Sequence, residues 1–277
     1  MGEHRGTMPA LTSTENRLLR RLPAFSPIAI RLLSAISDER SSFKEVARLI
    51  SLDPVLSGEV LRLANSGLYG RRFEVRSILH AIAMLGFGKL SQIAMTAALW
   101  RGLPRRTAPY VREWWRHSIA TALLARQCGD EFSSDFDYTA GLLHGVGQLA
   151  LFADAPDDYP ELVDCAYGER SNLAERERQV FGVDHASLAG ILLESWGLPE
   201  KLCNAVASHH SVSTSPKDLE HAVQIACLGA EYSGFGRCGC HESLALSVPD
   251  ALAELLADNN VIEKLVTGVN EIECSLG

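Results

Sequence analysis

The sequence predicts an all-α protein, on three observations. Apolar residues recur at helical spacing in many windows, as Phe43, Val46 and Ile50 do. No window shows the sustained alternation of apolar and polar residues that is typical of a strand. Helix-starting residues separate the apolar windows; Asp53 is placed to cap a helix whose first position is Pro54.

The elements follow in order. Residues 1–14 are polar and are expected to form a flexible tail. Two helical segments are expected within 15–37, because Pro23 and Pro27 interrupt it. Ser77 is predicted to cap a helix over 78–85 that Gly86 ends, and another helix covers 90–100. The prolines and charges of 103–109 predict a boundary. Later helices are expected over 110–128, 138–153, 159–168, 173–181, 185–196, 200–209 and 219–233, then a loop over 234–244 and two short helices within 250–272.

Composition narrows the class of protein. The chain has 277 residues, 47% hydrophobic and 22% charged, and a net charge of −8. Nucleic acid is therefore not an expected partner, because backbone phosphates need a basic face. No run approaches the length that spans a bilayer and no secretory signal is recognised, so no membrane association is expected. Seven scattered cysteines indicate reduced thiols and a cytoplasmic location.

The stretch 142–149 (LLHGVGQL) organises the second half of the chain. Tyr138, Leu142, Val146 and Leu149 share helical spacing, which predicts one continuous helix with a core-facing side. His144 lies inside this apolar run, where an imidazole must be hydrogen-bonded, bound to a metal or facing a cavity.

Several motifs occur in one order along the chain: 52–57 (LDPVLS), 61–66 (LRLANS), 77–86 (SILHAIAMLG), 115–118 (WRHS), 141–144 (GLLH), 181–186 (FGVDHA), 196–199 (WGLP) and 209–210 (HH). In these the chain resembles HDOD domains, the HD-related output domains of bacterial signalling proteins, from about residue 18 to about 233. The resemblance implies a helical N-terminal lobe (15–103) packed on an HD-like helical bundle (108–235), with 236–277 as a C-terminal loop and helices.

The resemblance also implies a metal site and shows where it has changed. HD phosphohydrolases hold a divalent metal with a histidine, a His-Asp pair and a later aspartate. Here His117 and His144 match the two histidines, but Gly145 replaces the carboxylate of the pair. The later aspartate is expected at 225–228, but this segment (IACL) contains no acidic residue. His185, His209 and His210 match positions that hold extra metals in related proteins.

The candidate metal ligands are therefore His117, His144, His185, His209 and His210. No cofactor is expected, and a divalent transition metal such as zinc, nickel or copper, with Cys227 as a thiolate ligand, is the alternative. The competing interpretation is that His117 and His144 are core histidines bonded to carbonyls or to each other. Adjacent helical residues point about 100° apart, so at most one of His209 and His210 is expected to face a shared pocket.

Two further features have weaker implications. Cys238, Cys240 and His241 lie close together, but they lack the second ligand pair of a structural zinc site and are interpreted as a loop. Arg101, Arg105, Arg106 and Arg112 flank tryptophans and are candidate contacts for a partner or a phosphate, with a solvated face as the alternative.

Three functions follow. The leading one is a non-enzymatic signalling module that contacts a signalling protein in trans through its surface. The second is a metal-dependent phosphohydrolase acting on a nucleotide or cyclic dinucleotide. The third is a nucleotide or nucleic-acid sensor that uses the arginines, which makes a nucleotide second messenger a further candidate partner. No catalytic residue is assigned, and Gly145→Asp is expected to raise metal affinity where the imidazoles converge.

Overall fold

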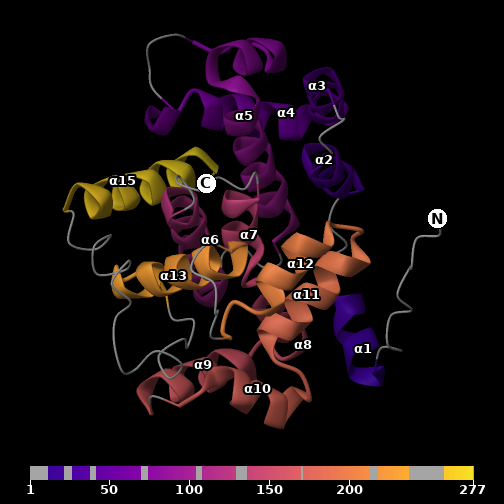
Figure 1. The fold of residues 1–277 in the computed structure, drawn as a ribbon, viewed down its shortest axis with the longest axis vertical. Coiled ribbons are helices and arrows are strands. Elements are labelled where there is room, and N and C mark those ends of the chain that lie inside the picture. The colour runs from indigo at the N-terminus through magenta and orange to yellow at the C-terminus, as the bar shows by residue number, and fades with distance from the viewer. Residues whose placement is uncertain are drawn as a thin grey trace.

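The computed structural model describes residues 12–21, 27–37, 42–69, 74–103, 108–128, 136–169, 171–211, 218–236 and 259–276. Within these ranges the regular elements are helices and no strand occurs, which confirms the predicted all-α class. Figure 1 shows α2 to α5 gathered at one end of the molecule, with α6 to α13 below them.

The first half contains α1 (Ser13–Arg21), α2 (Pro27–Ser37), α3 (Phe43–Ser51), α4 (Pro54–Ala64), the 3-10 turn η1 (Gly67–Tyr69) and α5 (Ile78–Gly102). The predicted caps are confirmed: the Asp53 side chain accepts from the backbone N–H of Val55 and Leu56, and Ser77 accepts from that of His80. Gly86 has φ 79° and kinks α5 at the predicted break, so the two expected helices form one kinked element.

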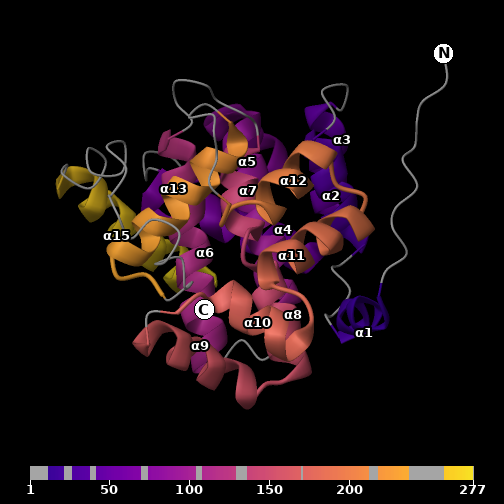
Figure 2. The same cartoon turned by 60° about the horizontal axis from the view of Figure 1, so that its bottom comes forward.

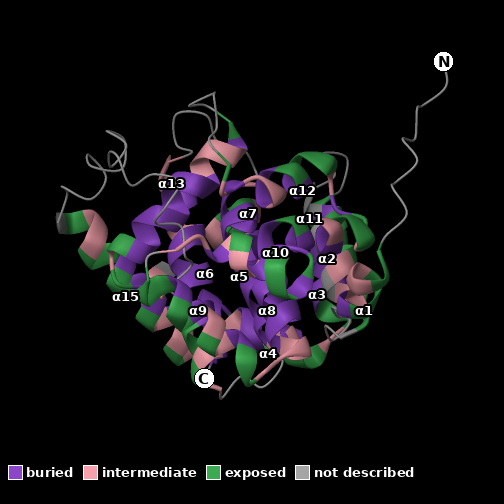
Figure 3. Cartoon of the chain, turned by 90° about the horizontal axis from the view of Figure 1, so that it is seen from below, coloured by how far each residue is buried: buried purple, intermediate pink, exposed green. Residues whose placement is uncertain are grey.

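The second half contains α6 (Pro109–Cys128), α7 (Asp137–Leu143), α8 (Val146–Asp154), α9 (Asp158–Gly168), α10 (Leu173–Phe181), α11 (His185–Ser195), α12 (Glu200–Ala207) and α13 (Leu219–Tyr232). Helix α6 packs on α7 and α13, and α11 packs on α8 and α12, an arrangement that Figure 2 shows from a second side. Buried residues fill the centre between these helices in Figure 3.

Two predicted helices end early, and both ends matter for the site. The helix expected through 142–149 stops at Leu143, and a new one starts at Val146, so His144 and Gly145 form a turn. The helix expected over 200–209 stops at Ala207, which leaves His209 and His210 in a turn. The first break interrupts an apolar run, so periodicity alone could not reveal it.

The last described element is α15 (Asn259–Leu276), a single helix where two short ones were expected within 250–272; residues 250–258 lie outside the described ranges. It packs against α6 and α4. The Trp100 indole N–H donates to the Leu276 carbonyl over 3.0 Å and so fastens the end of α15 to α5.

Among the described residues, α5 alone has the length and apolar character of a membrane span. The positive φ of Gly86 interrupts it, and its second half, from Leu90 to Trp100, is almost entirely buried against the rest of the protein. That burial is typical of a core helix.

Candidate metal centre

The five predicted histidines converge. His117 lies within α6, His144 in the turn after α7 and His185 at the first position of α11, while His209 and His210 follow α12. With Cys227 they form two groups, and within each group the potential ligand atoms lie within 4.8 Å of one another. The first triad is His117, His144 and Cys227 of α13, and the second triad is His185, His209 and His210. The His144 and His209 rings, with centroids 5.0 Å apart, join the two triads.

The turn that presents His144 is held by a tryptophan. The Trp114 indole N–H donates to the Gly145 carbonyl over 2.7 Å, and the same carbonyl accepts the Gln148 backbone N–H at 3.0 Å at the start of α8. A Cβ on Gly145 would lie only 2.7 Å from that indole nitrogen. A side chain at position 145, where the resemblance to HD phosphohydrolases places an aspartate, would therefore require the indole to shift.

Backbone carbonyls determine the tautomers of the first triad. His117 Nδ1 lies 2.7 Å from the Phe235 carbonyl, and His144 Nδ1 lies 2.7 Å from the Gly141 carbonyl. A carbonyl can only accept, so each Nδ1 carries the hydrogen and each neutral ring has its lone pair on Nε2. The two Nε2 atoms are nevertheless 3.2 Å apart. Two facing lone pairs repel, and this geometry is relieved by a cation between them.

The third ligand atom of the first triad is a thiol. Cys227 Sγ lies 3.5 Å from His117 Nε2, and the Cys227 side chain is fully buried. Burial lowers the pKa of His144 well below its usual value, and the neighbouring His117 adds to the effect. His144 is consequently a neutral imidazole at pH 7, the form that binds metal.

The second triad contains both members of the His-His pair, which corrects the expectation that only one could face a shared pocket. Their ring centroids are 4.0 Å apart. The 100° rule applies within a helix, and these residues lie in the turn beyond α12. His209 Nδ1 donates to the Val206 carbonyl over 2.6 Å, which leaves its buried Nε2 without a hydrogen-bond partner.

Sequence reasoning missed one buried acid, Glu177 of α10. Its carboxylate accepts from His185 Nδ1 over 2.6 Å and from the His185 backbone N–H over 2.8 Å. It also accepts from the Tyr159 hydroxyl at 2.5 Å. A signal was present, because Leu173, Glu177 and Phe181 are spaced four apart on the buried face of α10. A charged residue on an apolar face must have buried partners.

These residues fit a soft or borderline transition metal. Imidazole and thiolate are ligands that zinc prefers, and a ring whose other nitrogen donates to a carboxylate or a carbonyl is the usual form of a metal-bound histidine. His185 with Glu177 is of this form, as are His117 and His144 with their carbonyls. The unpartnered Nε2 of His209 is a further potential metal ligand, and its lack of a hydrogen-bond partner favours a bound cation.

Each triad reaches a surface cavity. His117 lines one of about 240 Å³, beside α9. His185 and His210 line another of about 220 Å³, whose wall includes Arg178 and Asp184. The Asp184 carboxylate caps α11 through the Ser187 N–H and pairs with Arg178 at 2.8 Å. Burial works to raise the pKa of Asp184, but these hydrogen bonds outweigh it and hold the pKa below its usual value.

The predicted arginine contacts are only partly described. Arg101 pairs with Asp53 and lies 3.7 Å from Glu59, and Arg112 pairs with Glu273 at 3.4 Å. Arg105 and Arg106 lie outside the described residues, as do Cys238, Cys240 and His241. A phosphate-binding role for the arginines stays a prediction, and it would require Arg101 and Arg112 to exchange these carboxylate partners.

Comparison with known proteins agrees with this architecture. A family model described as the HDOD domain matches residues 22–212. An HDOD domain protein of unknown function from Geobacter sulfurreducens has a similar crystal structure, with a TM-score of 0.74 and 24% identity, over 94% of this chain and 98% of that one. A candidate phosphohydrolase from Shewanella amazonensis SB2B gives a TM-score of 0.73 and 21% identity, over 96% and 99% of the two chains.

Among curated proteins, an uncharacterised protein of Treponema pallidum (strain Nichols) is 23% identical over 203 residues. The match covers 72% of this chain but only 39% of that relative, so the chain spans about two fifths of its length. Identities this low support the fold and say nothing of activity.

Proposed function

Because the chain belongs to the HDOD family, we propose that it is a bacterial signal-transduction output module that works through contacts with a protein partner and does not hydrolyse phosphoesters. The observation that carries this proposal is the packing of Trp114 against Gly145. It removes both the carboxylate of the His-Asp pair and the room for one.

The surroundings of the triads support the same conclusion. Activation of a metal-bound water is assisted by a carboxylate close to the metal. The carboxylate of Glu177 contacts the triad residue His185, and both of its oxygens accept hydrogen bonds from His185 or Tyr159. Cys227 stands in the first triad, where a thiolate suits a structural zinc ion.

In this proposal His117, His144 and Cys227 would hold the metal of the first triad, and His185, His209 and His210 that of the second. An ion in the first triad would cross-link α6, α13 and the turn after α7, and an ion in the second would join the start of α11 to the turn after α12. The centre would thus stabilise the bundle as a rigid platform.

A surface for a protein partner is available on α3 to α5. Five large apolar side chains of the described residues are about half exposed or more there: Phe43, Leu52, Val55, Leu79 and Met84. Leu52 and Val55 lie on either side of the cap residue Asp53, whose hydrogen bonds fix the backbone at the start of α4. Exposed apolar side chains that concentrate on one part of a molecule are typical of interaction surfaces.

The test combines activity with binding. We expect the protein loaded with zinc, manganese or nickel to turn over neither bis(4-nitrophenyl) phosphate nor a cyclic dinucleotide above the metal-only rate. Turnover that His144→Ala abolishes would overturn the proposal.

For the interface, Val55→Glu is expected to abolish capture of a partner from the bacterial host, while Val180→Glu, at an equally exposed position on α10, retains it.

The alternative is a metal-dependent phosphohydrolase acting on a nucleotide or cyclic dinucleotide. One observation favours it: five imidazoles still converge, and the second triad opens to a polar cavity beside Arg178. The same turnover assay decides between the two functions, because a hydrolase would lose activity in His185→Ala and in His144→Ala alike.

A further inference from the structure

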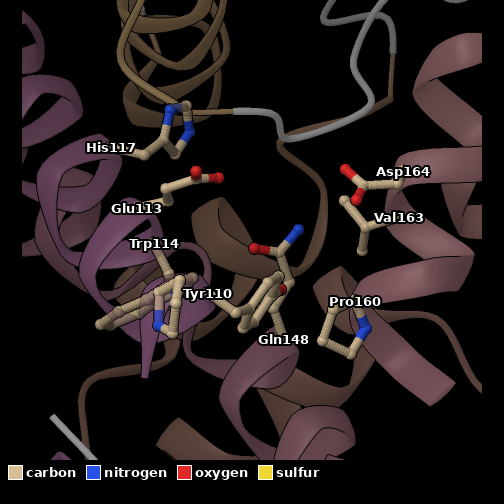
Figure 4. Close-up of a pocket in the computed structure, with 9 residues that line it drawn as sticks. Tyr110, Glu113, Trp114, His117, Gln148, Pro160, Val163 and Asp164 are labelled. Atoms are coloured by element: carbon tan, nitrogen blue, oxygen red, sulfur yellow. The ribbon is translucent and has the colours of Figure 1, made fainter. Parts of the chain in front are cut away.

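The cavity beside His117 is lined mostly by residues outside the two triads; His117 is the one described lining residue that belongs to a triad (Figure 4). It lies between the start of α6 and α9, and Gln148 of α8 is at its base. The described residues that line it are Pro109, Tyr110, Glu113, Trp114, His117, Gln148, Pro160, Val163 and Asp164, and none of them is a lysine or an arginine.

The charge of this cavity is negative. Glu113 and Asp164 face the space from opposite walls, one on α6 and the other on α9 (Figure 4). Both residues are exposed, so their carboxylates meet a ligand at the rim. With two negative charges and no described cation in the lining, the electrostatic potential repels phosphates and attracts cations.

Gln148 supplies the second observation. Its side chain is only 4% exposed and points into the cavity, yet its Nε2 has no hydrogen-bond partner (Figure 4). A buried amide that lacks a hydrogen-bond partner destabilises the protein, and a ligand oxygen in the cavity would supply the missing acceptor. The ligand therefore carries a hydrogen-bond acceptor as well as a positive charge.

Two aromatic rings complete the cavity. Tyr110 stacks on Phe152 with ring centroids 5.1 Å apart and an interplanar angle of 24°. The Trp114 indole is held by its hydrogen bond to the Gly145 carbonyl. Fixed aromatic rings attract alkylated ammonium groups. They also provide apolar surface for the methyl groups of such a ligand.

We propose that this cavity binds a small organic ammonium compound that also carries a hydroxyl or carbonyl oxygen. Glu113 and Asp164 would balance the charge, Gln148 would donate to the oxygen, and Tyr110 and Trp114 would pack on the alkyl groups. The volume of about 240 Å³ lies below the roughly 300–1,000 Å³ of pockets for drug-sized ligands, so the ligand is small.

The proposal does not depend on the partner interface or on the absence of hydrolysis. It gives the module a candidate input, because His117 borders this cavity and also belongs to the first triad. A nucleotide does not fit, since its phosphates would meet the two carboxylates.

The test uses choline, which has a quaternary ammonium and a hydroxyl and cannot chelate a metal through nitrogen. The control is its uncharged carbon isostere, 3,3-dimethylbutan-1-ol. By calorimetric titration of the full chain as purified, we expect choline or its primary-amine counterpart ethanolamine to bind at least about tenfold more tightly than the isostere. Inorganic phosphate is expected not to displace it. Equal affinity for the isostere, displacement by phosphate, or no saturable binding of either amine would overturn the proposal.

Three variants test whether the ligand binds in this cavity. Gln148→Leu keeps the size of the side chain and removes the unpartnered amide, so the protein should fold with unchanged or higher thermal stability and lose about tenfold in ammonium affinity. Glu113→Gln is expected to weaken binding to a similar extent. Glu161→Gln makes the same charge change on α9 outside the cavity and should bind like the parent. Unchanged affinity in both Gln148→Leu and Glu113→Gln would show that the site lies elsewhere and would refute the proposal.

Discussion

Different groups hold the histidine side chains of the two triads in place. In the first triad, backbone carbonyls hold His117 and His144, and the only acidic group is the thiol of Cys227. In the second triad, a buried carboxylate holds His185, while a turn brings His209 and His210 together. The first triad contains no carboxylate, whereas the carboxylate of Glu177 contacts His185 of the second triad.

The difference teaches that imidazoles can be held in a converging arrangement without a carboxylate among them. Carbonyls orient an imidazole as firmly as a carboxylate does, but they bring no formal negative charge to balance a metal ion. We therefore expect the two triads to differ in their response to mutation and to pH, and four predictions test this, from the largest effect to the smallest.

Glu177→Ala should be the most damaging substitution. It leaves the His185 ring N–H, the His185 backbone N–H and the Tyr159 hydroxyl without their acceptor in a fully buried place. We expect the free energy of unfolding to fall by about 3–5 kcal/mol, measured by urea denaturation. The matched control Glu175→Ala, on the exposed side of α10, should change it by less than about 0.5 kcal/mol. Zinc affinity should fall at the second triad alone, and equal losses at both triads would remove the distinction between them.

Gly145→Asp should destabilise the protein by about 2–3 kcal/mol without raising zinc affinity. The structure thus changes the expectation drawn from the sequence, because the new Cβ would lie 2.7 Å from the Trp114 indole nitrogen. In Gly145→Asp with Trp114→Ala the space is open, and zinc affinity should rise at the first triad. A gain in zinc affinity in Gly145→Asp alone, measured by calorimetry, would mean that the indole moves aside.

Mild acid should destabilise the metal-free protein. Burial lowers the pKa of His144, His209 and His210 well below their value in the unfolded chain, so the unfolded state binds more protons as the pH falls. The stabilisation is complete above about pH 6.5 and is lost below it. From pH 7 to pH 6 each histidine contributes about 0.7 kcal/mol, and the three together about 2 kcal/mol. Urea midpoints in EDTA would measure this, and His209→Gln should remove about a third of the dependence.

Tyr159→Phe should have the smallest effect, about 1–1.5 kcal/mol, because it removes the hydroxyl that bonds Glu177 and Tyr110 but leaves Glu177 with its two contacts to His185. A double-mutant cycle with Glu177→Gln isolates the interaction. If the two substitutions are additive, the tyrosine does not support the carboxylate.

Much of this architecture could be predicted from local signals. The caps at Asp53 and Ser77 and the boundaries of α10 follow from short-range rules, and the structure confirms them. The turn at His144 could not be predicted, because the apolar pattern continues through it and the residue that holds it, Trp114, lies 31 positions earlier. The resemblance identified the five histidines, but their division into two triads depends on tertiary packing.

The hydrogen bond from the Trp100 indole to the Leu276 carbonyl has a practical consequence for anyone who expresses this domain. The family match ends at residue 212, yet the apolar face of the terminal helix, with Leu265, Val269 and Ile272, is completely shielded from water by the rest of the molecule. A fragment trimmed to the family boundary would lack both α13 and α15 and would expose the apolar surface of α6 and α4 that they cover. It should precipitate or associate with itself where the longer polypeptide stays dispersed.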